Sequence, residues 1–305
     1  MSDVAISVKG LRKAYGDHEA VRGIDFEIAA GEVFGFLGPN GAGKTTTIEI
    51  LEGYRERSDG QVSVLGVDPG SPTRAWRERV GLVLQECELD PLLTVREAVE
   101  LFATFYASPR PVDATIDLVG LADKREARIG SLSGGQKRRA DVAIGIIGDP
   151  DLIFLDEPTT GFDPTARREA WNMIEGLKEL GKTVFLTTHY MDEAQHLADR
   201  VAILRDGRIV AQGATEELGA RLGRRTVIGF ALSDGELPLE EVRSSLSAPL
   251  QISGNQVTVE TERPQADLYR LLSLAQERGI RLEDLEVRRP SLEDIFLDLT
   301  KEREA

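Results

Sequence analysis

The chain has only one cysteine, Cys87, among its 305 residues. A single cysteine cannot form a disulfide within the chain. Proteins that fold without disulfides are typical of a reducing cytosol. We interpret Cys87 as a small, partly buried residue. The cysteine count therefore argues against a small secreted domain held together by disulfides.

Long apolar runs are also missing. The longest candidates are AIGIIG at 143–148 and LIFL at 152–155, which are far shorter than the roughly 20 residues that span a bilayer. The first ten residues, MSDVAISVKG, contain no basic start followed by an apolar stretch, so they give no export signal. We therefore expect a cytoplasmic protein without a membrane span of its own.

Basic residues are too few to balance the acidic ones. The chain has 37 lysines and arginines against 52 aspartates and glutamates, a formal net charge of -15. So acidic a balance argues against the basic surface that nucleic-acid binding requires, and we expect no nucleic acid as a partner. The length is sufficient for one large domain and a smaller one.

What the sequence does contain is a glycine-rich turn, GPNGAGKTT, between an apolar run and a helical segment. Three glycines allow the backbone to wrap around an anion, and the start of the following helix offers unpaired N–H groups and a positive dipole end. Lys44 can then reach the β- and γ-phosphates of a nucleotide, and the Thr45 hydroxyl can bind Mg²⁺. The motif predicts a nucleoside triphosphatase of unspecified kind. Its expected binding residues are Gly38, Asn40, Gly41, Ala42, Gly43, Lys44, Thr45 and Thr46.

A second stretch, LIFLDEP, is an apolar strand that ends in Asp156 and Glu157. Beside a phosphate loop, one carboxylate at such a strand end can hold Mg²⁺ through water, and a second can polarise the attacking water. A solvated turn is the alternative interpretation. The phosphate loop upstream favours a catalytic pair, with Asp156 at the metal and Glu157 at the water.

A third stretch, SLSGGQKRR at 131–139, is a Ser-Gly-Gly turn that opens a helix. Ser133 can cap this helix, and its hydroxyl with the amides of Gly134 and Gly135 would form a second anion site. Since one ATP needs only one phosphate cradle, a second site suggests a role across a dimer interface. An ordinary helix cap remains the alternative.

Strands and helices alternate through the first two thirds of the chain, which indicates a parallel sheet covered on both faces. Two strands are predicted within residues 4–28. A mostly helical stretch is predicted at 94–143, and helices are predicted at 164–180 and 191–198. Apolar strands are predicted at 32–37, 80–86, 151–158, 183–189 and 200–207.

After about Gly223 the pattern changes to β-α-β-β-α-β, followed by a last helix near the C-terminus. This order is the ferredoxin-like pattern, and the segment contains no phosphate loop. We therefore predict an α/β domain over residues 1–223 and a small α+β domain over 224–305. The second domain is expected to serve regulation or dimerisation.

Taken together, the motifs resemble the nucleotide-binding subunit of ATP-binding cassette (ABC) transporters. GPNGAGKT resembles Walker A, LSGGQ the signature sequence that ends at Gln136, and LIFLDEP Walker B. By the same resemblance Gln85 is the Q-loop glutamine, Asp163 belongs to the D-loop, His189 is the switch histidine, and Tyr15 is the aromatic that stacks on adenine. The D-loop departs slightly, with Phe162 where leucine is more common.

The resemblance implies a P-loop NTPase fold of ABC type, with a helical subdomain at about 86–147. It also implies that two copies sandwich two ATP molecules head to tail, each phosphate loop facing Ser133 and Gly135 of the other copy. Glu157 would be the general base, His189 would contact the γ-phosphate, and Mg²⁺ would be served by Thr45, Gln85 and Asp156. The histidines at 18 and 196 are expected to be surface residues.

The C-terminal stretch RRPSLEDIFLDLT at 288–300 resembles the closing motif of drug-exporter ATP-binding subunits of the daunorubicin-resistance type. The resemblance implies an ATPase homodimer beneath a separate transmembrane permease, peripheral at the inner face of the membrane. An importer subunit and a non-transport ABC ATPase remain alternatives. A non-hydrolysing regulator conflicts with the intact Glu157. The sequence does not identify the transported substrate.

Overall fold

The structure is a computed structural model that describes residues 4–83, 89–215, 225–232 and 249–288. It also describes the single residues Leu218, Val242, Arg243, Leu246, Leu292 and Phe296. The chain divides into two compact units between Thr215 and Glu216. The domain boundary predicted at Gly223 falls outside the described residues and stays a prediction. Each unit is described by itself.

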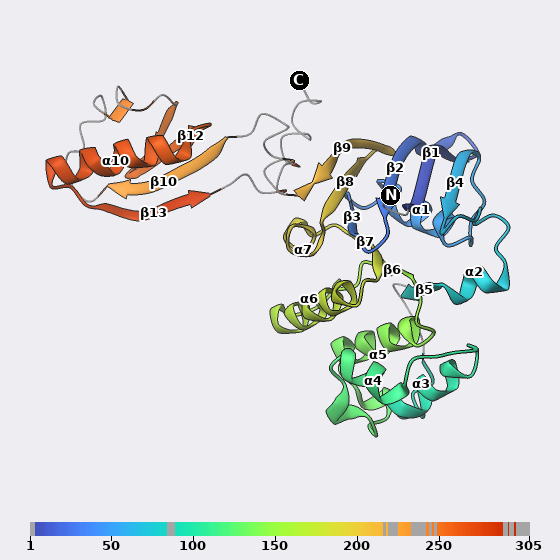
Figure 1. Cartoon of the computed structure of the whole chain (residues 1–305). Coiled ribbons are helices and arrows are strands. Elements are labelled where there is room, and N and C mark those ends of the chain that lie inside the picture. Colours follow the sequence, from blue (N-terminus) through green and yellow to red (C-terminus); the bar gives the residue numbers. More distant parts are fainter. Residues whose placement is uncertain are drawn as a thin grey trace. The chain divides into compact units, whose positions relative to one another are not determined.

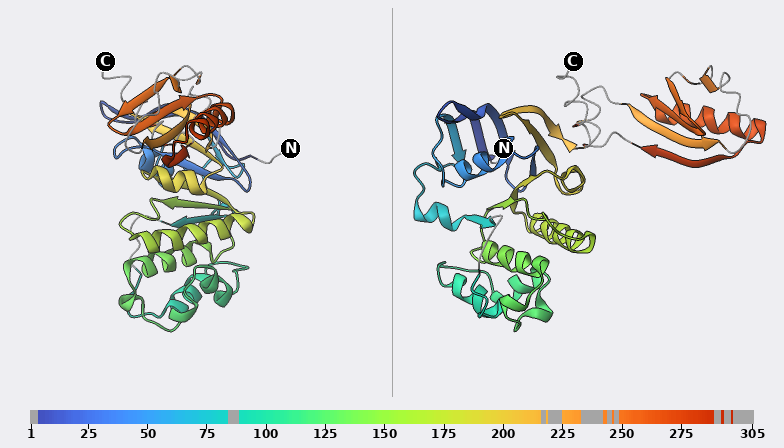
Figure 2. Two further views of the ribbon diagram at one scale, coloured as in Figure 1. Left: turned by 90° about the vertical axis from the view of Figure 1, so that its left-hand side faces the viewer. Right: turned by 180° about the vertical axis from the view of Figure 1, so that it is seen from behind.

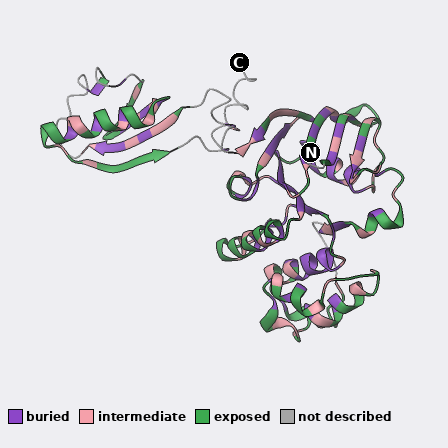
Figure 3. Ribbon diagram, in the orientation of Figure 1, coloured by how far each residue is buried: buried purple, intermediate pink, exposed green. Residues whose placement is uncertain are grey.

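The first unit is built on a six-stranded sheet (Figure 1). The first five strands in the spatial order are parallel, and the sixth, β9, pairs antiparallel with β8 at the edge. The strand order is β5 (Val80–Val83), β6 (Leu152–Asp156), β7 (Thr183–Thr188), β3 (Val33–Leu37), β8 (Arg200–Arg205) and β9 (Arg208–Ala214). Every residue of β3, β6 and β7 is buried (Figure 3), as expected for strands covered on both faces.

A second, antiparallel sheet packs against one side of the first. Its order is β2 (His18–Ala29), β1 (Val4–Tyr15) and β4 (Asp59–Val64). Helix α1 (Lys44–Leu51) and both sheets share one apolar core, which contains Phe26, Phe34, Phe36, Phe154 and Phe185. The Phe36 and Phe185 ring centroids, for example, lie 5.4 Å apart. This packing brings the β1–β2 hairpin into the same core as the helix that follows the phosphate loop.

Helices cover the other face of the central sheet and form a separate group in the views of Figures 1 and 2. Helices α3, α4 and α5 contact one another and contribute to a second core with strand residues such as Leu155 and Leu186. They correspond to the helical stretch predicted at 94–143. The helix bounds are α2 (Arg74–Glu78), α3 (Val95–Ala103), α4 (Val112–Leu118), α5 (Gly134–Ile146), α6 (Pro164–Glu179) and α7 (Met191–Leu197), with short 3-10 turns at Ala122–Lys124 and Ile129–Ser131.

The second unit is a four-stranded antiparallel sheet packed against helix α10 (Pro264–Arg278). Its small core contains Ile228, Phe230, Val257 and Leu271. The predicted first helix of this unit and the predicted last helix lie almost entirely outside the described residues. The strand order is β11 (Leu250–Ser253), β12 (Gln256–Thr261), β10 (Thr226–Leu232) and β13 (Leu282–Arg288), with the first and third strands of the chain order in the centre, as in the predicted ferredoxin-like fold.

Candidate functional site

The phosphate loop connects β3 to α1, and its glycines are required by close backbone contacts. A Cβ atom at Gly38 would lie 2.4 Å from the carbonyl oxygen of Leu204. At Gly43, where φ is 104°, a Cβ atom would lie 2.5 Å from the carbonyl oxygen of Ala20. Because neither position admits a side chain, the loop can lie directly against β8 and β2. The N-terminus of α1, with its unpaired N–H groups, then opens toward the space above the loop.

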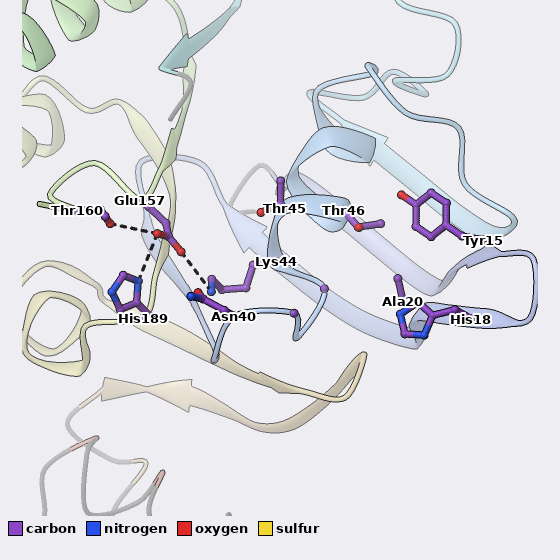
Figure 4. A pocket seen from close by; sticks show the side chains of 12 residues that line it. Tyr15, His18, Ala20, Asn40, Lys44, Thr45, Thr46, Glu157, Thr160 and His189 are labelled. Carbon is purple, nitrogen blue, oxygen red and sulfur yellow. Dashed lines mark hydrogen bonds and ion pairs between the residues drawn. The ribbon is translucent and has the colours of Figure 1, made fainter. Parts of the chain in front are cut away.

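Lys44 is held at the mouth of this loop. Its side chain is only 5% exposed, and Nζ donates to the carbonyl oxygens of Gly38 at 2.8 Å and Pro39 at 3.3 Å. Nζ also lies 3.4 Å from Oε1 of Glu157 (Figure 4). The ammonium group is therefore pinned between the loop and a carboxylate, where it can meet the phosphates of a bound nucleotide.

Glu157 immediately follows β6 and adopts an unusual backbone conformation, with φ of 45°. Non-glycine residues in the left-handed region cost of order 1–3 kcal/mol and persist where the surroundings enforce them. Here the Glu157 N–H donates to the carbonyl oxygen of Thr187 at 3.1 Å. The carboxylate accepts from Thr160 Oγ1 at 3.1 Å and lies 3.3 Å from Nδ1 of His189. The strained turn thus aims Glu157 at both Lys44 and His189.

The electrostatic surroundings keep Glu157 ionised. Burial raises the pKa of this carboxyl. Lys44, Thr160 and His189 lower the pKa by more than burial raises it, so the net shift is downward. A carboxylate that is charged at neutral pH can accept a proton or orient a water molecule. Glu157 thus has the charge state that a general base requires, and its role as the general base stays a prediction.

Asp156 is buried behind Glu157. Thr187 Oγ1 donates to its carboxylate, and Arg138 Nη2 donates to its backbone carbonyl at 2.8 Å. Burial raises the pKa of Asp156, although the Thr187 hydrogen bond opposes the change. A cation bound beside this carboxylate would offset the desolvation. Within the described residues, no cluster of three or more His, Cys, Asp or Glu could hold a metal by itself, so a cation here would take most ligands from phosphate and water, as Mg²⁺ does.

Lys44, Glu157 and His189 line one cleft of about 670 Å³, a size typical of small-molecule sites. In Figure 4, Tyr15 lies at one end, Glu157 and His189 at the other, and the phosphate loop between them. Tyr15 is 41% exposed, with Lys13 Nζ 5.1 Å and the Arg55 guanidinium 5.3 Å from its ring centroid. The lining residues are Tyr15, His18, Ala20, Asn40, Gly41, Gly43, Lys44, Thr45, Thr46, Glu157, Thr160 and His189.

Three of the lining residues, His18, Ala20 and Thr160, were not expected from the sequence. His18 is expected as a surface residue, and it is exposed, but it pairs with Tyr15 across the tight hairpin and so enters the cleft with it. The hairpin position beside Tyr15 is the signal that could have identified His18. Thr160 follows Glu157 by three residues in one turn, which is spacing enough to suggest the contact.

The remaining predicted residues, Gly38 and Asp156 included, are not among the described residues that line this cleft. Gln85 is outside the described residues, and Ala42 is buried. Ser133 caps α5 by accepting from the Gln136 N–H at 3.3 Å, and Gln136 Oε1 accepts in return from the Ser133 N–H at 2.9 Å. Asp163 caps α6, accepting from two N–H groups at 2.9 Å each. The described residues that line the cleft include neither these caps nor Gly134 and Gly135.

Comparisons with known protein families match both units. The family model described as ABC transporter matches residues 21–160, and the model described as ABC transporter domain-containing protein-like, C-terminal domain, matches residues 226–291. The first match spans the phosphate loop, the capped α5 and the Asp156–Glu157 pair. The matches therefore place a transporter ATPase domain and a related C-terminal domain in one chain.

Two curated relatives match this chain over nearly its whole length. The chain is 38% identical over 314 residues to the daunorubicin resistance ATP-binding protein DrrA3 of Streptomyces coeruleorubidus, covering 98% of this chain and 97% of that one. It is 39% identical over 306 residues to Nod factor export ATP-binding protein I of Rhizobium sp. (strain N33), covering 98% of each.

Solved structures show the same fold over 71% and 68% of this chain. The ATP-binding cassette MJ1267 of an ABC transporter, in its ADP conformation, gives a TM-score of 0.63 at 22% identity, over 71% of this chain and 93% of that chain. The dimeric post-hydrolysis state of the cassette MJ0796, bound to ADP and Pi, gives 0.61 at 25% identity, over 68% and 98%.

In the part of the chain that the structure describes, no helix is both long enough and apolar enough to cross a bilayer. The phosphate loop, the ionised Glu157 beside Lys44 and the near full-length relatives point to the same assignment. The chain belongs to the ABC transporter family and is one of its ATP-hydrolysing subunits.

Proposed function

We propose that this chain hydrolyses ATP to power the export of a substrate through a separate membrane permease. The observation that carries the proposal is the convergence of Lys44, Glu157 and His189 at one end of the cleft above the phosphate loop. The names of the relatives, for daunorubicin resistance and Nod factor export, support export as the direction of transport. Nothing in the comparisons favours an importer.

In the proposed binding mode, ATP lies along the cleft. Its base stacks on Tyr15, and its phosphates meet Lys44 and the N–H groups at the start of α1. The Thr45 hydroxyl and the Asp156 carboxylate, with Gln85, would hold Mg²⁺, which neutralises phosphate charge when bound. In Figure 4 the phosphate loop with Lys44 lies between Tyr15 and the Glu157–His189 pair, which suits this orientation.

In the proposed reaction, Glu157 orients the attacking water and accepts its proton. Lys44 stabilises negative charge on the phosphates, and His189, beside Glu157, contacts the γ-phosphate. The contacts of Glu157 with Lys44 and His189 keep its carboxylate charged and aimed into the cleft before ATP arrives. Little rearrangement of these side chains is then needed at the moment of reaction.

We further propose that the active form is a homodimer with ATP between the copies. Ser133 and Gly135 of one copy would close over the phosphates bound by the other, with Asp163 at the same contact. The dimeric MJ0796 cassette supports such an assembly. A Cβ atom built on Gly134 meets no atom within 4 Å, so the turn is open on that side.

Membrane contact is proposed to be indirect. The permease would dock on the surface near residues 85–94 and hold the dimer at the inner face of the membrane. The permease would also select the substrate. The second unit is proposed to assist regulation or dimer contact, because residues 224–305 contain no phosphate loop.

The test is Glu157→Gln. Loss of a general base lowers the hydrolysis rate by about 10²- to 10⁴-fold, which corresponds to roughly 3–5 kcal/mol of barrier, while Lys44 and the loop continue to bind ATP. Hydrolysis should therefore fall by that factor with little change in ATP affinity, measured with a fluorescent ATP analogue. As the matched control, Lys44→Ala should weaken binding itself. A Glu157→Gln chain that hydrolyses ATP at the parent rate would refute the mechanism.

A further inference from the structure

Glu193, on α7, is a completely buried carboxyl with no part in the proposed mechanism. Its side chain has 0% exposure, and its Oε1 accepts a hydrogen bond from Thr159 Oγ1 at 2.7 Å. Thr159 is likewise 0% exposed. An apolar residue would avoid the desolvation cost of a buried carboxyl. The position of this hydrogen bond therefore calls for an explanation.

The bond joins the two segments that present Glu157 and His189. Thr159 lies two residues after Glu157, in a turn closed by hydrogen bonds from Thr160 N–H to the Glu157 carbonyl at 3.3 Å and from Phe162 N–H to the Thr159 carbonyl at 3.1 Å. Glu193 lies four residues after His189, on the helix that begins at Met191. Glu157 and His189 come from different strand ends and face each other in Figure 4.

At the strand ends Thr187 also bonds to Asp156 and Glu157, but beyond the strands the neighbouring contact of α6 with α7 is more exposed. Arg167, on α6, lies 3.2 Å from Asp192 and stacks over the Tyr190 ring at 4.5 Å. The Asp192 side chain is 59% exposed, and an ion pair so open to solvent contributes little. The Thr159–Glu193 bond, by contrast, lies wholly out of water, where a hydrogen bond is stronger and its loss more costly.

The surroundings of Glu193 are polar on more than one side. Burial raises the pKa of Glu193, although Thr188, Thr159 and Trp171 each oppose the change. Thr188 directly precedes His189, and its Oγ1 also accepts from the Tyr190 N–H at 3.0 Å. Among the described residues, Glu193 Oε2 and Trp171 Nε1 find no hydrogen-bond partner of good geometry. The carboxyl thus sits where the turn after Glu157, the end of β7 and helix α6 meet.

We propose that Glu193 is a positioning residue for ATP hydrolysis: through its hydrogen bond with Thr159, it holds the turn that presents Glu157 against the helix that follows His189. The inference rests on the proposed roles of Glu157 and His189. Loss of the bond allows the distance between those two side chains to vary, while Lys44 and the phosphate loop keep their contacts. A misplacement of about 1 Å can cost about 100-fold in rate.

The experiment compares Glu193→Ala, Thr159→Val and their double variant with the parent in full-length protein. Each single variant should lower kcat by about tenfold to 100-fold and leave KM for ATP within about twofold. Glu193→Gln retains the acceptor oxygen and should keep most of the parent kcat. Because the singles remove one shared contact, the double variant should fall no further than either single.

Thr183→Val is the matched control. Thr183 is also buried on β7, and its Oγ1 accepts from the Gly31 N–H at 2.9 Å at the opposite end of that strand. Thermal unfolding and kcat of the Thr183→Val variant show the effect of losing one buried threonine hydroxyl that does not link Glu157 with His189. If Glu193→Ala does not fold, the near-isosteric Thr159→Val decides the question.

The inference is overturned if Thr159→Val and Glu193→Ala match Thr183→Val in kcat, if the loss appears in KM, or if the two effects add. Glu157→Gln in the same assay separates the two proposals. An inactive Glu157→Gln beside active Thr159→Val and Glu193→Ala refutes only the role of Glu193. A Glu157→Gln chain at the parent rate refutes both.

Discussion

Single carboxyl groups in the first unit show how burial and charge divide their roles. Glu157 is partly buried but surrounded by Lys44, Thr160 and His189, so its pKa falls. Glu52, at the C-terminal end of α1, is 7% exposed, and burial with the nearby charges of Asp156 and Glu49 raises its pKa to about 8. The first carboxyl is charged at neutral pH, as the proposed general base must be. The second is kept neutral by its surroundings near neutral pH.

The raised pKa of Glu52 predicts a pH-dependent stability. Its folded pKa of about 8 exceeds the ordinary 4.5, so the folded chain binds the extra proton between these values. Stability from this group is fully present below about pH 4.5 and is lost as pH rises through about 8. The full difference corresponds to an upper bound of about 5 kcal/mol.

Glu52→Gln should remove this dependence. Urea unfolding at several pH values should show that the variant is more stable than the parent at pH 8–9, and that the advantage shrinks toward pH 5. An unchanged pH profile in Glu52→Gln would mean that Glu52 is charged in the folded chain.

At the scale of elements, two helices are capped by residues that, by the family resemblance, would contact a second copy of the chain. Ser133 caps α5 through a reciprocal bond with Gln136, and Asp163 caps α6. A helix start with unpaired N–H groups attracts anions as well. Capping in one chain and phosphate contact in a dimer are therefore compatible uses of the same turn.

The dimer proposal predicts that Glu157→Gln accumulates as a dimer with ATP and Mg²⁺, because slow hydrolysis preserves the nucleotide between the copies. Adding Ser133→Arg should abolish that dimer, since a bulky side chain blocks closure over the phosphates. Sedimentation or light scattering measures the outcome. Dimerisation of the double variant as strong as that of Glu157→Gln would contradict the proposed contact.

Loss of a helix cap alone is controlled by a second double variant. Thr94 caps α3 with the same reciprocal pattern, accepting from the Glu97 N–H at 3.2 Å. Removing either cap costs about 1 kcal/mol, but the dimer proposal assigns the contact between copies to Ser133 and not to Thr94. Glu157→Gln combined with Thr94→Arg should therefore still dimerise with ATP.

At the scale of the whole molecule, the two units have separate cores. Among the described residues, those that line the cleft all belong to the first unit, and in the sequence they run from Tyr15 to His189. The second unit packs its own sheet against α10 around Phe230 and Leu271. Each unit thus has the apolar interior that independent folding requires.

This separation predicts that a chain ending at Gly223 binds ATP with nearly the parent affinity. The measurement is titration with a fluorescent ATP analogue, after circular dichroism and cooperative thermal unfolding have verified that the truncated chain is folded. A large loss of affinity in a folded truncation would show that the second unit contributes to nucleotide binding.

The sequence by itself determined the parts of the site whose chemistry lies in one continuous stretch. The phosphate loop needs glycines, Lys44 and Thr45 in a set order, because backbone and side chains of one turn act together. The apolar strand before Asp156 and Glu157 and the change of pattern after Gly223 are also local properties. Helices predicted at 164–180 and 191–198 were observed at Pro164–Glu179 and Met191–Leu197.

Only the tertiary structure decided which of these stretches meet. The contacts of Glu157 with Lys44 and His189 join residues from two strand ends and the start of α1, and no spacing in the sequence prescribes their distances. His18 enters the cleft because its hairpin packs beside α1. The bond between Thr159 and Glu193 spans 34 positions and exists because α7 packs over the turn. Such contacts depend on how apolar faces pack between distant segments, which local patterns of residues do not encode.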